Sequence, residues 1–99
     1  MAQLCEASVG QPVEVTLEFF DIDGVTPKDT TPTGKVMHPD GETVDSYTGG
    51  QVTHVGTGVY TFVFTPSTDG RWYIRGEGTG SLVAAQDGDY VYVPDSPFV

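Results

Sequence analysis

The stretch GVYTFVFTPSTDGRWYIRGEGTG (residues 58–80) carries the clearest structural signal in this chain of 99 residues. Large apolar side chains alternate with smaller ones from Tyr60 to Phe64, and a second alternating run surrounds Trp72. A period of two in aromatic and β-branched residues is typical of β-strands. The residues PSTDG between the runs favour a turn. We therefore predict a β-hairpin in which Trp72 is buried against Phe62 or Phe64 of the neighbouring strand.

The same pattern extends outward along the chain. PVEVTLEFF (residues 12–20) alternates cleanly, and KVMHPDGETVDSY (residues 35–47) predicts a strand, a turn at HPDG and a second strand. A short strand is expected at residues 51–55, and the segments SLVAAQ and DYVYVP complete the sheets. Seven or eight short strands without helical periodicity predict an all-β fold, a single immunoglobulin-like antiparallel β-sandwich. The expected core comprises Val15, Leu17, Val36, Tyr60, Phe62, Phe64, Trp72, Ile74 and Val91.

The two ends of the chain are expected to lie outside this sandwich. We assign residues 11–93 to the domain, residues 1–10 to an N-terminal segment that could serve as a docking arm, and residues 94–99 to a C-terminal tail. End segments are poorly ordered unless something binds them. These segments carry apolar side chains and the only cysteine of the chain. The candidate protein contacts are therefore Leu4, Cys5, Phe98 and Val99.

The charge of the chain is strongly acidic. Fourteen Asp and Glu residues face four Lys and Arg residues, which gives a formal net charge of −10. Nucleic-acid binding needs a basic surface that neutralises phosphates, so we expect no nucleic-acid partner, and an anionic membrane is disfavoured for the same reason. The N-terminus lacks the features of a signal peptide, and no apolar run is long enough for a membrane span. These observations predict synthesis in a cytoplasm without export.

Cys5 leaves two interpretations open. A chain with one cysteine forms no internal disulfide. A free cysteine is most often a small buried apolar residue. The alternative is an accessible thiol near the chain end that pairs with a neighbouring subunit.

The search for catalytic and metal-binding residues gives weak signals. Asp21 and Asp23 in FFDIDG resemble the start of a calcium loop, but the third acid is missing and Pro32 stands where the last ligand belongs. The alternative is a turn whose Asp side chains bind their own backbone, and this is the interpretation that we favour. His38 and His54 lack partners at zinc-ligand spacing. We expect no catalytic residues, no cofactor and no metal.

The segment from Gly58 to Val93 resembles small immunoglobulin-like structural proteins of tailed bacteriophages. The shared pattern is G-x-Y-x-F-x-F-x-P, a turn with glycine, W/Y-x-x-R, G-T-G and an A-A-x-x-G-x-Φ-x-V ending. In this chain the pattern falls on Gly58, Tyr60, Phe62, Phe64, Pro66, Gly70, Trp72, Arg75, Gly78, Thr79, Gly80, Ala84, Ala85, Gly88, Tyr90 and Val93.

The resemblance implies a non-enzymatic virion accessory protein. Its expected partners are capsid, neck, collar or tail subunits, and the chain is expected to be homo-oligomeric or present in many copies. Its expected location is the virion, after synthesis in the cytoplasm of the bacterial host. The alternative function is a module that binds carbohydrate on the host surface through Tyr73, Trp72 or nearby loops, since aromatic rings stack on sugars.

Overall fold

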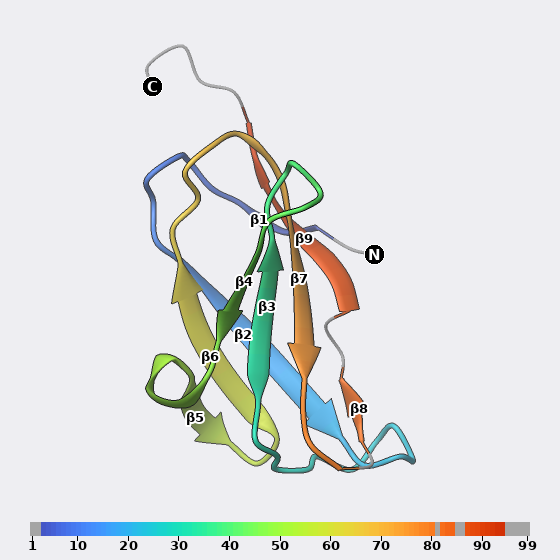
Figure 1. Cartoon of the computed structure of the whole chain (residues 1–99). Helices are drawn as coiled ribbons and strands as arrows, with labels where there is room; N and C mark the ends of the chain where they lie inside the picture. The colour runs from blue at the N-terminus through green and yellow to red at the C-terminus, as the bar shows by residue number, and fades with distance from the viewer. Residues whose placement is uncertain (1–2, 81, 85–86, 95–99) are drawn as a thin grey trace.

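Two β-sheets packed face to face form the molecule, as the computed structural model shows for residues 3–80, 82–84 and 87–94 (Figure 1). The side chains of Gln3 and Asp87 are not described. The five-stranded sheet has the order β1 (Gln3–Glu6), β9 (Asp87–Val93), β7 (Gly70–Glu77), β3 (Thr33–Met37) and β4 (Val44–Tyr47). The four-stranded sheet has the order β5 (Thr53–Gly56), β6 (Val59–Phe64), β2 (Val13–Phe20) and β8 (Val83–Ala84).

The predicted all-β sandwich is confirmed, with corrections in detail. The described residues contain nine strands rather than seven or eight. The strand pairs are antiparallel except for β1, which runs parallel to β9. The strand expected at residues 51–55 begins instead at Thr53, after a short 3-10 helix, η1 (Gly49–Gln51).

The predicted hairpin in residues 58–80 is wrong. Strand β6 belongs to the four-stranded sheet and β7 to the five-stranded sheet, so residues 65–69 carry the chain from one sheet to the other. The large side chains of the two strands therefore face each other across the interior, and the rings of Phe64 and Trp72 lie 5.8 Å apart. The indole Nε1–H of Trp72 donates to the carbonyl oxygen of Thr68 at 3.1 Å, which fixes this connection. Trp72 is buried as predicted, but Phe64 contacts it from the opposite sheet.

The core lies between the two sheets and follows the alternation in the sequence. In β2 every second residue from Val13 to Phe19 is buried, and the residues between them are exposed. All nine predicted core residues are buried. The structure adds four further buried apolar residues, Ala7, Val13, Phe19 and Val93.

A pair of glycines makes room for aromatic rings in this core. Gly34 of β3 and Gly76 of β7 lie opposite each other in the five-stranded sheet. A Cβ atom on Gly34 would lie 2.5 Å from the ring of Phe62, and one on Gly76 would lie 3.4 Å from the ring of Phe19. Side chains from one sheet thus fill the space that the glycines leave in the other, as close packing of the interior requires.

Candidate functional site

The outer face of the five-stranded sheet gathers aromatic, basic and aliphatic side chains. Trp72 and Ile74 of β7 point into the core, so Arg71, Tyr73 and Arg75 point outward. The registers of the neighbouring strands add further outward residues to this set. Lys35 lies opposite Arg75, Met37 and Tyr90 lie opposite Tyr73, and Tyr92 lies opposite Arg71. We call these seven residues the front face.

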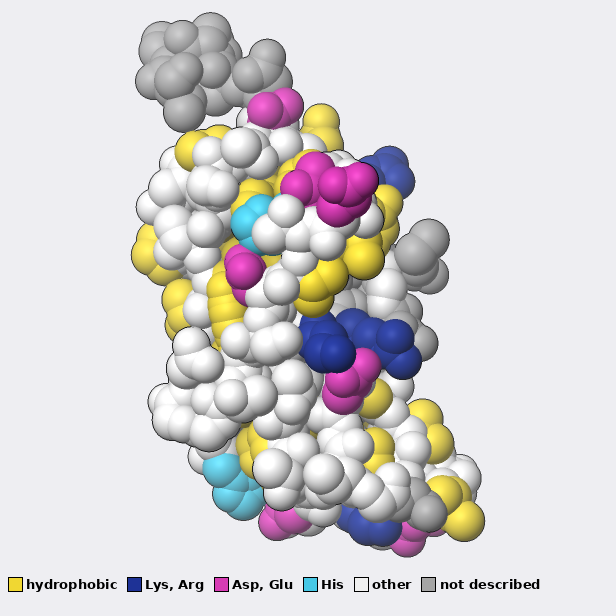
Figure 2. Space-filling view, viewed as in Figure 1, with side chains coloured by type: hydrophobic (Ala, Val, Ile, Leu, Met, Phe, Trp, Pro, Cys, Tyr) yellow, Lys and Arg dark blue, Asp and Glu magenta, His cyan; other side chains and the backbone are white. Residues whose placement is uncertain are grey.

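The basic residues of the front face are held by neighbours on the same surface. Lys35 Nζ lies 3.0 Å from Glu77 Oε1, and Arg75 Nε lies 3.5 Å from Glu77 Oε2. The guanidinium of Arg71 lies 4.8 Å from the ring centre of Tyr90, a cation–π contact. Figure 2 shows this side of the molecule, with basic side chains grouped around an acidic one near its middle. Three of the four basic residues of the chain therefore lie on one face.

An open hollow of about 560 Å³ indents this face. Met37, Val44 and Tyr73 supply much of its apolar lining, with Lys35, Ile74, Arg75, Glu77 and Gly88 completing it. Met37 and Val44 are exposed large apolar residues, with 37% and 45% of their surface accessible. The hollow offers room for an apolar group, and charged side chains lie on its lining.

The predicted contact residues near the N-terminus lie in β1, at the edge of the five-stranded sheet. Residues 1–10 were expected to lie outside the strands, but Gln3–Glu6 form β1 and Ala7 is buried in the core. The side chain of Leu4 is 40% exposed, and Cys5 is exposed as a free thiol. The buried interpretation of Cys5 is therefore wrong and the accessible thiol is correct. Phe98 and Val99 lie outside the described residues.

A hydrogen-bond network around Asp29 lies at one end of the sandwich. The turn between β3 and β4 lies at the other end (Figure 1). The carboxylate of Asp29 accepts the backbone N–H of Gly58 at 2.6 Å, and His54 Nε2 lies 3.1 Å from the same oxygen. The bond from Gly58 is the main cause that lowers the pKa of Asp29. The ring of His54 stacks on Tyr60, whose hydroxyl exchanges hydrogen bonds with the backbone of Thr30. These contacts join the loop after β2 to β5 and β6, which is a structural role.

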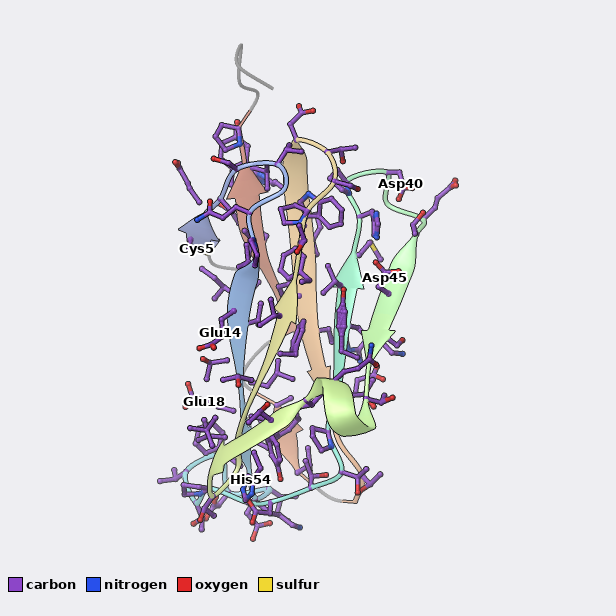
Figure 3. The ribbon with its side chains drawn as sticks, turned by 90° about the vertical axis from the view of Figure 1, so that its left-hand side faces the viewer. Cys5, Glu14, Glu18, Asp40, Asp45 and His54 are labelled. Atoms are coloured by element: carbon purple, nitrogen blue, oxygen red, sulfur yellow. The ribbon has the colours of Figure 1, made fainter. Side chains whose placement is uncertain are left out.

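His38 has a similar structural role at the other end. Its Nε2 atom lies 2.6 Å from Asp45 Oδ2, and its ring centre lies 4.3 Å from that of Trp72. Figure 3 shows Asp45 near this upper end and His54 at the lower end of the sandwich. Within the described ranges, no group of three His, Cys, Asp or Glu side chains is placed to hold a metal ion.

Two turns share the sequence D-G-x-T and one hydrogen-bond pattern. Asp23 accepts the backbone N–H groups of Val25 and Thr26 and the hydroxyl of Thr26. Asp40 accepts the equivalent three bonds from residues 42 and 43. The favoured interpretation of DIDG as a backbone-binding turn is thus confirmed. These bonds lower the pKa of both carboxyls. The pKa of Asp40 falls to about 2, and the hydrogen bond from the backbone N–H of Glu42 is the largest cause of this shift.

Comparison with known proteins supplies no relative. No protein-family model, curated protein or solved structure matches the chain. None of the described residues belongs to a helix with the length and apolarity of a membrane span.

Sequence reasoning found part of the front face and missed the rest. The alternation in RWYIR places Arg71, Tyr73 and Arg75 on one side of a strand. It does not show that Lys35 and Tyr90 join them, because this depends on the pairing of strands far apart in the sequence. The usable signal was the pair Arg71 and Arg75 on one side of a predicted strand.

Proposed function

We propose that this chain is a non-enzymatic structural component of a tailed-phage virion. It is made in the cytoplasm of the bacterial host and docks in many copies on the capsid, the neck or collar, or the tail. The observation that carries the proposal is the front face, an extended surface of Tyr, Arg and Met side chains on a rigid sheet. The resemblance of residues 58–93 to phage structural proteins supports the choice of particle.

The composition of the front face favours a protein partner. Tyr, Arg and Met are enriched in protein–protein interfaces, and Tyr and Arg supply much of the binding energy at their centres. Arg71 and Tyr73 belong to this class, and both are carried by β7, an inner strand of the sheet. The backbone of a strand is already ordered, so binding through it needs no ordering of a loop.

The edge strand β1 supplies a second contact in this proposal. An edge strand presents backbone groups that can pair with another chain. Leu4 and Cys5 lie on β1 and are exposed. Together with Phe98 and Val99 of the tail, they are the proposed contacts at the chain ends.

The second candidate function, binding of host-surface carbohydrate, is favoured by one observation. The rings of Tyr73 and Tyr90 lie 6.0 Å apart on the front face, beside Arg71. Such rings offer apolar surface to a sugar. Trp72 takes no part, because only 2% of its surface is accessible.

Labelled antibody against the chain, imaged on purified virions, tests the proposal. We expect regular labelling at one structural location of the particle. Arg71→Ala with Tyr73→Ala should reduce incorporation, whereas Glu42→Ala, an exposed change on the β3–β4 turn, should not. Unlabelled particles refute the virion role. Titration with polysaccharide from the host surface tests the second candidate, which requires binding that is lost in Tyr73→Ala.

A further inference from the structure

The two outer faces of the sandwich differ in charge. On the inner strands β3, β7 and β9, the described outward side chains include Lys35, Arg71 and Arg75 and a single acid, Glu77. The edge strand β1 adds one exposed acid, Glu6, opposite Tyr92. The other outer face belongs to β2 and β6, where Glu14 and Glu18 point outward between the buried residues of β2. Figure 3 shows both glutamates projecting away from the interior.

The second face, which we call the back face, carries no basic residue on β2 or β6. Its outward side chains are Glu14, Thr16, Glu18 and Phe20 on β2 and Val59, Thr61 and Val63 on β6. Lys28 lies in the loop that follows β2, with its Nζ atom 4.0 Å from Asp21. The back face is therefore acidic, in contrast to the front face.

The charges on the two faces have the same spacing. Arg71 and Arg75 lie four residues apart on β7, and Glu14 and Glu18 lie four residues apart on β2. At 3.2–3.4 Å per residue in a strand, each pair spans about 13 Å. Two sheets packed face to face keep their strands roughly aligned, so both arginines can meet both glutamates at once.

The shapes and apolar surfaces of the two faces also match. The front face carries large side chains around an open hollow, and the back face carries Val and Thr side chains beside Glu14, Glu18 and Phe20. Exposed apolar residues occur on both sides, with Met37 and Val44 at the front and Val63, 54% exposed, at the back. Contact between the faces would bury these groups together with the charge pairs.

We propose that copies of this chain stack front to back, with the front face of one copy on the back face of the next. In this stack Arg71 and Arg75 pair with Glu14 and Glu18 of the neighbouring copy. The contact joins two different surfaces, so it repeats along a ring or a filament instead of closing as a dimer. This inference rests on the multi-copy role proposed above and names the chain itself as one of its partners.

The net charge determines the conditions under which the stack forms. Copies with a formal net charge of −10 repel each other at a distance. The screening length is about 30 Å at 0.01 M salt and about 8 Å at 0.15 M, so physiological salt weakens the long-range repulsion more than the contact pairs. Association should therefore be stronger at 0.15 M than at 0.01 M salt. Attachment to a particle would raise the local concentration toward the millimolar range.

Sedimentation velocity of the purified chain tests the stack. The concentration series should reach about 1 mM, because effective concentrations in linked systems are in the millimolar range. We expect the wild type to associate with rising concentration at 0.15 M salt. Arg71→Glu with Arg75→Glu, and separately Glu14→Lys with Glu18→Lys, should each weaken association at least about tenfold, because like charges then meet. An equimolar mixture of the two double variants should associate again, because each face then meets an opposite charge.

The glutamate variant separates the specific contact from the net charge. Each Glu→Lys change adds two positive charges, so the formal net charge moves from −10 to −6 and general repulsion falls. Loss of association in this variant therefore points to the faces. Circular dichroism confirms folding, and the single changes Arg71→Glu and Glu14→Lys replace any double variant that fails to fold.

Three results would overturn the stack: a monomeric wild type throughout the series, a double variant that associates like the wild type, or a mixture that stays monomeric. None of these results bears on whether the chain is present in virions. Absence from virions would refute the proposed function and leave the sedimentation result unchanged.

Discussion

Replacing Trp72 with Ala is the sharpest test of how the two sheets are held together. Trp72 is 2% exposed and lies between the ring of Phe64, 5.8 Å away, and the ring of His38, 4.3 Å away. Large-to-small changes at buried aromatic positions cost about 3–5 kcal/mol. The carbonyl of Thr68 also loses its donor. Domains of this size have a free energy of unfolding of about 5–15 kcal/mol, so the change should remove about a fifth of it or more.

Urea unfolding followed by circular dichroism measures this loss. The variant has no fluorescent tryptophan, because Trp72 is the only one in the chain. Val63→Ala, on the exposed side of β6, is the control and should change the free energy of unfolding by about 0.5 kcal/mol or less. If Trp72→Ala lowers the free energy of unfolding by less than about 1 kcal/mol, the position of Trp72 in the core is refuted. Efficient quenching of the native wild-type fluorescence by iodide would refute it as well.

Four further predictions concern other parts of the chain. Gly58→Ala should destabilise the fold by about 1–3 kcal/mol, because Gly58 has φ of 70° and a Cβ there would lie 2.5 Å from a backbone oxygen. Gly50→Ala is the unstrained control, and urea unfolding compares the two variants. Equal midpoints would contradict the strain at Gly58. Asp40→Ala should lower the urea midpoint at pH 6 and have a much smaller effect near pH 2. The folded pKa of Asp40, about 2, lies below the usual value of 3.8, so the stabilisation by its carboxylate disappears as the pH falls through that window. A difference independent of pH would contradict this. Cys5 should react with a thiol reagent in the native protein as fast as in urea, and strong protection would contradict its exposure. Calorimetry with Ca²⁺ should detect no micromolar site, because the Asp23 carboxylate already accepts hydrogen bonds from its own turn, and a micromolar site would overturn that reasoning.

Local patterns in the sequence predicted the strands and the core well. The alternation from Val13 to Phe19 determines which side of β2 is buried, wherever that strand lies in the sheet. The same holds for Tyr60 to Phe64 and for Trp72, since a large apolar residue needs a buried face. These predictions depend on neighbouring residues only, and they were confirmed.

The placement of strands in sheets was harder to predict. A turn such as residues 65–69 joins two alternating strands equally well within one sheet or between two, so the sequence could not distinguish a hairpin from a crossing. Strand β1 was missed for a related reason. QLCE is short and lacks clear alternation, and its position depends on backbone pairing with β9.

The candidate site shows the same division between local and distant information. The two arginines of RWYIR could be assigned to one side of a strand from the sequence alone. The position of Lys35 beside Arg75, and of Glu77 between them, follows from the register of β3 on β7. A register depends on the whole sheet, and no short pattern in this chain encodes it.

Quantitative mass spectrometry of purified virions tests the central claim most directly. The proposed function requires that a phage genome encodes this chain, so the particles should come from that phage, with the major capsid protein as the internal standard. Our account predicts a constant ratio of this chain to the capsid protein, corresponding to many copies per particle. Absence of the chain, or a trace amount that falls further with each purification step, would contradict the account.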